Sequence, residues 1–202
     1  MKKFFIACAM FIASSITAWA DCPITSTDFA KAYQDVPIVA GTLALNGNVV
    51  TTSLINYLIN DENPVDVKVA AINAVAFDKD VYTPMMDNLK AKFNTNSEIT
   101  VLGKIGASTH TALAYARARC YYLDLSEAYI LGYSAFLKDP DGFTTNMVYA
   151  LMLTTDVMSR DFCQVYKICN AVVTNSQLKQ DMRPQAITMM MEYINLYKND
   201  CK

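Results

Sequence analysis

The chain carries a single histidine, which limits the chemistry that it can perform. His110 is the only imidazole among the 202 residues, so a three-histidine zinc site within one chain is excluded. A Cys-His dyad with Cys120 is also excluded, because ten residues of helix separate the two by about 15 Å along the axis. We expect His110, at the start of a helix, to be solvated or to cap that helix.

Two carboxylates share the turn D-P-D-G at residues 139–142, a pattern found in calcium-binding loops. An EF-hand loop would need an oxygen ligand where Phe143 stands and a glycine where Thr144 stands, so we interpret the segment as a turn. The other acids lie mostly at helix starts and in loops, where they cap and solubilise. The sequence contains no glycine-rich phosphate loop and no G-x-S-x-G motif.

Methionine gives the one metal hypothesis. The chain has 11 methionines, and thioether sulfur is a ligand for Cu(I). Met189, Met190 and Met191 are consecutive, however, so they point to different sides of a helix. We therefore expect methionine to fill the core, and we expect no metal or other cofactor.

Tyrosine and arginine are concentrated in one predicted helical hairpin. These residue types are enriched at interface hot spots, although they also fill the junctions between helices. We expect any partner-binding face to lie there, on Tyr115, Arg117, Arg119, Tyr122, Tyr129 and Tyr133.

The first twenty residues have the pattern of a secretory signal peptide. Lys2 and Lys3 precede an apolar run at residues 4–16, and A-W-A at 18–20 predicts cleavage before Asp21. The apolar run is shorter than the ~20 residues of a membrane span. We expect an exported protein, periplasmic or secreted, with one domain over residues 21–202 and no membrane anchor after cleavage.

Export makes the cysteines disulfide candidates. Five follow the predicted signal, so at most two bridges can form. Two of them, six residues apart in one predicted helix, are separated by about 9 Å along the axis, which is too far for a bridge. A bridge from either needs a partner distant in sequence, near one end of the chain. The five candidates are Cys22, Cys120, Cys163, Cys169 and Cys201.

Composition favours a folded domain without affinity for nucleic acid. Hydrophobic residues make up 53% of the chain and charged residues 18%, and the formal net charge is −2. Such a chain can bury a core and has no basic field for nucleic acid. With only 6 glycines and 6 prolines, the many tight turns of a sandwich or barrel are not expected.

Apolar residues recur mainly at helical spacing. The pattern predicts a short helical stretch at 26–35, a further helix from Ser97, and longer helices at about 52–60, 65–77, 81–93, 109–122, 126–137, 144–158, 161–173 and 176–197. Pro184 falls inside the last of these and should start or kink it. Residues 37–50 are compatible with strand or helix, with a turn at 46–48. We expect an all-α single domain of about nine or ten short helices stacked as antiparallel hairpins, or alternatively an irregular helical bundle.

Two segments resemble helical repeats. Residues 61–75, DENPVDVKVAAINAV, are similar to the turn and second helix of a HEAT repeat, with small alanines where neighbouring helices approach closely. A second stretch resembles a tetratricopeptide unit, although Arg119 and Gly132 stand where that unit has aromatic residues. Its small positions and terminal proline are Ala116, Ala128, Ala135 and Pro140. These resemblances imply a solenoid-like array of helical hairpins.

A third likeness concerns residues 127–133, EAYILGY, with Cys120 upstream. They are similar to the AYI-x-G helix of periplasmic Tai-type immunity proteins, which are exported, helical and disulfide-bonded and block a toxin. The cysteine that directly precedes that motif in the family is absent here. The resemblance implies an immunity-type inhibitor.

The function that we expect from the sequence is non-enzymatic binding of a protein or peptide. One alternative is an exported hydrolase or metal-binding protein with a site made of Asp, Tyr, Arg and Cys, and another is the immunity-type inhibitor. A binding module should carry a contiguous exposed patch of tyrosine and arginine. An enzyme should instead have a deep pocket with convergent acids.

Overall fold

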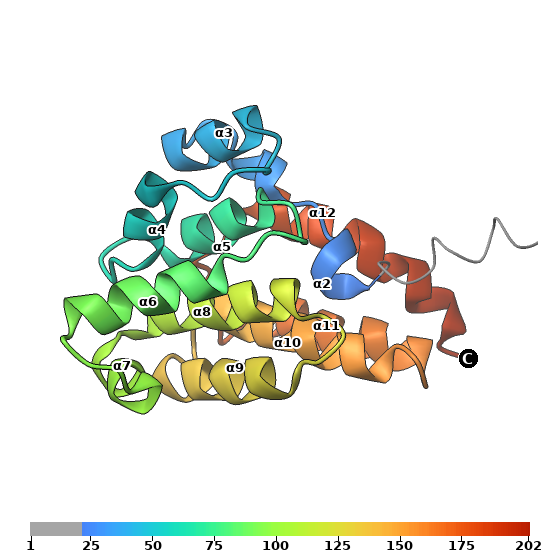
Figure 1. Cartoon of the computed structure of the whole chain (residues 1–202). Coiled ribbons are helices and arrows are strands. Elements are labelled where there is room, and N and C mark those ends of the chain that lie inside the picture. The colour runs from blue at the N-terminus through green and yellow to red at the C-terminus, as the bar shows by residue number, and fades with distance from the viewer. Residues whose placement is uncertain (1–21) are drawn as a thin grey trace, which may run out of the picture.

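The described part of the protein, residues 22–202 of a computed structural model, is built from helices (Figure 1). The predicted signal peptide and its cleavage site before Asp21 lie outside the described residues. Between residues 22 and 202 there is no β-strand, and one isolated bridge joins Gly142 to Lys179. The α-helices are α2 (Pro23–Ser26), α3 (Pro37–Ala44), α4 (Thr52–Leu58), α5 (Val65–Asn73), α6 (Tyr82–Lys92), α7 (Glu98–Lys104), α8 (Ala107–Cys120), α9 (Ser126–Lys138), α10 (Phe143–Val157), α11 (Phe162–Thr174) and α12 (Pro184–Ile194). Two 3-10 helices, η1 (Ala30–Tyr33) and η2 (Asn195–Asp200), complete the chain.

Local sequence explains where many of these helices begin. The side chains of Thr51, Ser97 and Asp161 each accept a hydrogen bond from the backbone N–H three residues later, at the starts of α4, α7 and α11. Such caps satisfy N–H groups that have no partner inside the helix. Helices α2, α3 and α12 instead have a proline in their first turn, where its missing N–H removes no hydrogen bond.

The sequence was compatible with either strand or helix at residues 37–50. This segment forms the helix α3 and the predicted turn. The turn places Asn46 and Gly47 at φ values of 51° and 67°. A side chain at Gly47 would overlap the backbone of Ala74 and Ala76. Glycine is therefore required here by space as well as by conformation.

Helix α8 occupies the centre of the domain (Figure 1). It packs against α5 and α6 on one side and against α9 and α10 on the other. The short connection at residues 121–125 makes α8 and α9 an antiparallel hairpin, as the sequence predicted. Close packing on several sides is possible because the helix carries small buried side chains. These are Ala112, Ala114, Ala116 and Ala118.

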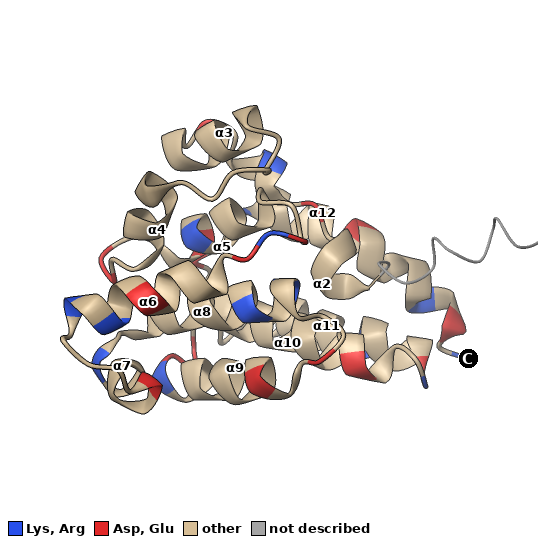
Figure 2. Cartoon of the chain, in the orientation of Figure 1, with Lys and Arg blue, Asp and Glu red and all other residues tan. Residues whose placement is uncertain are grey.

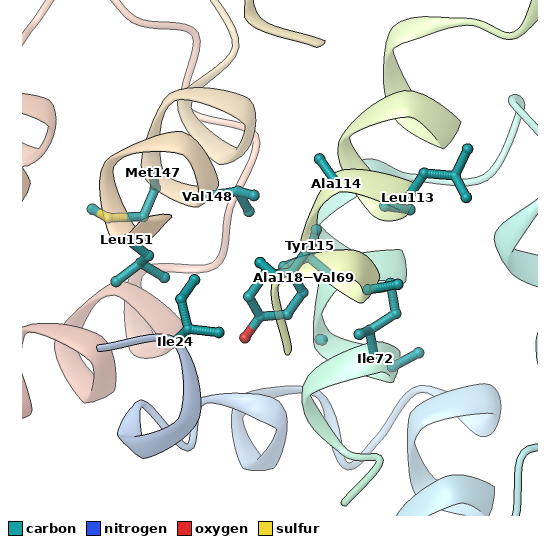
Figure 3. Packing of buried hydrophobic residues seen from close by; sticks show 14 of the residues in the cluster. Ile24, Val69, Ile72, Leu113, Ala114, Tyr115, Ala118, Met147, Val148 and Leu151 are labelled. Carbon is teal, nitrogen blue, oxygen red and sulfur yellow. The ribbon is translucent and has the colours of Figure 1, made fainter. Parts of the chain in front are cut away.

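Tyr115 of α8 lies in the middle of the hydrophobic core, between Ile24 and Val69 and close to Leu151 of α10 (Figure 3). Its phenol oxygen accepts a hydrogen bond of 3.0 Å from the side-chain amide of Asn73. The core therefore contains a polar link between α5 and α8, and the polar end of the tyrosine is satisfied without reaching solvent.

The predicted all-α single domain is confirmed, and the last long helix starts at the proline that was expected to start or kink it. The last long helix begins at Pro184 and not at residue 176. Residues 175–183 form a loop that pairs with the start of α10. The backbone carbonyl of Lys179 accepts a hydrogen bond from the N–H of Phe143, and the carboxylate of Asp181 accepts one from the N–H of Thr144. The N–H groups at the start of α10 need acceptors, and this loop supplies them.

Candidate partner-binding face

Two members of the predicted tyrosine and arginine face belong to the core. Tyr115 is completely buried, and Arg119 is buried as well. The Arg119 guanidinium donates to the carbonyl oxygens of Ile24 and Val75, at 3.4 and 2.9 Å. The prediction that these two residues contact a partner is corrected. They instead attach α8 to the N-terminal segment and to the end of α5.

Arg117 has a structural role at the same end of α8. Its guanidinium forms an ion pair of 2.7 Å with Glu127 of α9. The same group lies 3.6 Å from the ring centroid of Tyr121 and 5.4 Å from that of Tyr82. These contacts hold the guanidinium between α6 and the α8–α9 connection, so Arg117 supports the face and does not extend from it.

Tyr133 is the exposed member of the predicted set, and it lies within a longer apolar stripe. Ile130, Tyr133 and Leu137 are 70%, 52% and 61% exposed. They follow one another at helical spacing on the outer side of α9. We call these three residues the α9 ridge. The sequence analysis missed Ile130 and Leu137.

The opposite side of α9 fixes the ridge in place. Ala128, Leu131 and Ala135 are buried there, against the rest of the domain. Gly132 is also buried, and a side chain at this position would meet the Met152 sulfur at 2.9 Å and the Tyr149 ring at 3.0 Å. Close approach of α9 to α10 therefore orients the ridge outward.

A polar cleft of about 470 Å³ lies beside the first turn of α9. It separates the α8–α9 connection from the end of α10. Its lining residues are Tyr122, Leu123, Asp124, Leu125, Ser126, Tyr129, Thr155, Asp156 and Ser159. We call it the α9 cleft. Tyr122 and Tyr129, both predicted to contact a partner, line it.

Two groups in the cleft are fixed by local hydrogen bonds. The Tyr129 hydroxyl donates to the carbonyl of Met152 at 3.1 Å, and burial raises the pKa of Tyr129 to about 12. Asp124 accepts from the hydroxyl and the N–H of Ser126, and these bonds lower the pKa of Asp124. The cleft therefore presents a neutral phenol and an ionised carboxylate at neutral pH.

Carboxylates flank the ridge at both ends. Asp124 and Glu127 precede it in the sequence, in the connection and first turn of α9, and Asp141 follows it. Figure 2 shows acidic residues in red on the α8–α9 connection and at the start of α9. The cation at the C-terminal end of α9, Lys138, is occupied, because its ammonium donates to the carbonyls of Leu102 and Ile105 at 2.8 and 2.7 Å. The ridge is thus an apolar stripe between acidic ends.

The structure corrects the expectation for His110. This side chain is completely buried on α8 and is neither solvated nor a cap. Helix α8 begins at Ala107, two residues earlier than predicted, so His110 lies inside the first turn of the helix. Gly106, and not a histidine, is the residue at the N-cap.

Among residues 22–202 the cysteines form one bridge, between Cys163 of α11 and Cys201 near the C-terminus, with Cα atoms 4.7 Å apart. The sequence left Cys22 and Cys201 as candidate partners for Cys163 or Cys169, and it excluded a bridge from Cys163 to Cys169. Cys22, Cys120 and Cys169 are free thiols. The bridge ties α11 to the C-terminal residues. Neither cysteine belongs to the α9 ridge or lines the α9 cleft.

Metal-binding groups do not converge within the described residues. No set of three His, Cys, Asp or Glu side chains between residues 22 and 202 could hold an ion. Met147, Met152, Met182 and Met190 are buried in the core, as predicted for methionine that fills space. None of the described helices is long and apolar enough to cross a membrane.

The α9 ridge and the α9 cleft together form a surface that can bind a partner by apolar and polar contacts. Exposed apolar side chains gain free energy when a partner removes them from water, and the neighbouring carboxylates can accept hydrogen bonds from cations. No protein family, curated protein or solved structure matches this chain.

Proposed function

We propose that this protein is an exported, non-enzymatic module that binds a protein or peptide partner through the α9 ridge. The observation that carries the proposal is the run of three large apolar side chains, Ile130, Tyr133 and Leu137, each more than half exposed on one face of one helix. Exposed apolar side chains that are contiguous mark interaction sites more often than scattered ones do.

The charges around the ridge define the chemistry of the partner. Asp124 and Asp141 flank the apolar stripe. The Glu127 carboxylate is paired with Arg117, and the nearby Lys138 ammonium is held by carbonyl oxygens. A complementary segment is apolar in its centre and carries lysine or arginine beside it. A basic side chain of the partner can enter the α9 cleft and meet Asp124 next to the Tyr122 ring.

The disulfide and the N-terminal sequence support export. A disulfide persists in an oxidising compartment and is rare in the cytosol, and the Cys163–Cys201 pair has bridge geometry. The first twenty residues carry the signal-peptide pattern described above. We therefore place the binding event in the periplasm or outside the cell.

Site-specific crosslinking in producing cells tests the proposal. A photoreactive phenylalanine analogue is introduced at Ile130, and the matched control carries it at Leu196, which is 66% exposed on η2. We expect one discrete crosslinked partner from position 130 and none from position 196. Equal products at both positions, or a product at position 196 alone, would contradict the proposal.

The affinity for the crosslinked partner is then measured with surface variants. Ile130→Asp and Leu137→Asp should each weaken binding by about 10- to 100-fold, because burial of such a side chain contributes about 1.5–3 kcal/mol. Leu196→Asp should leave the affinity unchanged. Asp124→Lys should weaken binding, and the loss should be smaller in high salt.

A further inference from the structure

His110 is a buried titratable group without a hydrogen-bond partner. The side chain is fully buried, and among the described residues neither Nδ1 nor Nε2 has a donor or acceptor within reach. Buried polar groups in folded proteins are almost always paired. An unpaired imidazole is tolerated only as the neutral form, because the charged form would be buried without compensation.

Three elements place charged groups around His110. Lys138 at the end of α9 and Asp61, in the loop between α4 and α5, both act on it electrostatically, with opposite signs. Lys68 of α5, which is also fully buried, donates to the hydroxyl of the adjacent Thr109 at 3.0 Å. Lys92 of α6 acts in turn on Lys68.

These same charged groups hold the α7–α8 junction together. Lys138 donates to the carbonyls of Leu102 and Ile105 at the end of α7. Asp61 accepts from the N–H groups of Gly106 and Thr109 at the start of α8, at 2.9 and 3.2 Å. His110 therefore lies where two charge-assisted contacts fasten the end of α7 and the start of α8 to their neighbours.

We propose that the α7–α8–α9 junction is acid-sensitive, such that protonation of His110 repels the Lys138 ammonium and releases it from the carbonyl oxygens of α7. The proton comes from solvent when the junction opens transiently, and the imidazolium then opposes reclosure because its two N–H groups would be buried without acceptors. The Asp61 carboxylate already accepts hydrogen bonds from the N–H groups at the start of α8, so it offsets only part of the cost of burying the imidazolium charge.

The pKa shift of His110 agrees with this geometry. Burial, followed by the Lys138 charge, lowers the pKa of His110 to about 4, and Asp61 opposes the shift. An exposed histidine has a pKa of about 6.5. The open junction therefore binds a proton more readily than the closed one, and opening becomes easier as the pH falls below about 6.5. By linkage, the opening equilibrium should rise about 20-fold at pH 5 relative to pH 7.

The opening would also act on the α9 ridge, because Leu137 directly precedes Lys138. Release of Lys138 frees the C-terminal end of α9 and displaces this end of the ridge. Only this consequence rests on the proposed function. The acid-sensitive junction itself is tested without any partner.

The single histidine makes the titration directly observable. The whole protein has one imidazole C2–H resonance, and we expect its NMR titration midpoint to lie far below 6.5. Lys138→Met should raise this midpoint, because it removes the neighbouring cation, and Asp61→Asn should lower it further. A midpoint near 6.5 in the native protein, or one that neither variant moves, would overturn the proposal.

Hydrogen exchange locates the opening. Protection of the amides of α7 and the first turn of α8 should fall about 20-fold between pH 7 and pH 5, after correction for the intrinsic exchange rate. Amides of α12, far along the chain, should lose much less. His110→Gln, which cannot be protonated, should keep its protection unchanged over this range. An equal loss in His110→Gln and the native protein would contradict the role of His110.

Discussion

Asn73 on α5 donates its side-chain amide to the Tyr115 phenol oxygen on α8, 3.0 Å away, and both residues are buried. The same amide group donates to the carbonyl of Thr27, and its oxygen accepts the N–H groups of Phe29 and Ala30, each at 2.9 Å. One side chain thus satisfies four polar groups in two segments, residues 27–30 and α8.

Replacement of Asn73 should therefore be costly. Asn73→Ala leaves buried N–H, C=O and hydroxyl groups unpaired, and each such group costs about 1–3 kcal/mol. We expect the free energy of unfolding, measured by urea titration, to fall by at least about 3 kcal/mol. Asn88→Ala is the control, because Asn88 is exposed and should change stability by less than about 0.5 kcal/mol. Similar losses in the two variants would contradict this account of the core.

The Cys163–Cys201 bridge closes a loop of 38 residues. By the loop-entropy relation its removal should lower the free energy of unfolding by about 4 kcal/mol. Cys163→Ser with Cys201→Ser is compared with Cys120→Ser, which removes a free thiol. Peptide mapping without reductant should show the 163–201 link and no link between Cys163 and Cys169. A stable double variant would show that the bridge contributes little.

The buried ammonium of Lys68 should make the free energy of unfolding depend on pH in alkaline solution. Burial lowers the pKa of Lys68 to about 8, from 10.5 in the unfolded chain. Between these values the unfolded chain binds the extra proton, so stability should rise as the pH increases from about 8 to 10.5. Lys68→Met should lack this rise and should equal or exceed the native stability at pH 7. Parallel pH profiles of the two proteins, obtained by thermal unfolding, would contradict the prediction.

Export predicts a defined N-terminus. The signal pattern at residues 1–20 places cleavage between Ala20 and Asp21. Mass spectrometry of the protein from the exported fraction should give Asp21 as the first residue. Ala18→Lys with Ala20→Lys should block cleavage, because the enzyme that removes the signal requires small residues there. Full-length protein with an intact Met1 in the exported fraction would refute the prediction.

The sequence predicted the helices well because most of them carry their own start signals. The caps at Thr51, Ser97 and Asp161 act within a few residues of the chain. The loop before α12 was not predicted, because it is held by contacts with the start of α10, about 37 residues away in sequence. Contacts of that range leave no local pattern. The likeness to HEAT and tetratricopeptide repeats stays a prediction.

The candidate face was harder to predict, because both sides of α9 are apolar. Ile130 and Leu137 are exposed whereas Leu131 and Ala135 are buried, and no difference in residue type separates the two sets. Helix α8 is buried around most of its circumference, so Tyr115 could not be assigned to the core from periodicity. Only the packing of α9 against α10 decides which stripe faces outward.

Arg183 joins the two ends of the described chain. Its guanidinium donates to the carbonyl of Ala32 and to Asp35, and its N–H donates to the Tyr33 hydroxyl. The first helical turns and the last long helix are consequently seated on each other. The first helical turns therefore reach their final contacts only after the chain as far as Arg183 has been synthesised, so folding of the N-terminal segment depends on residues about 150 positions later in the sequence.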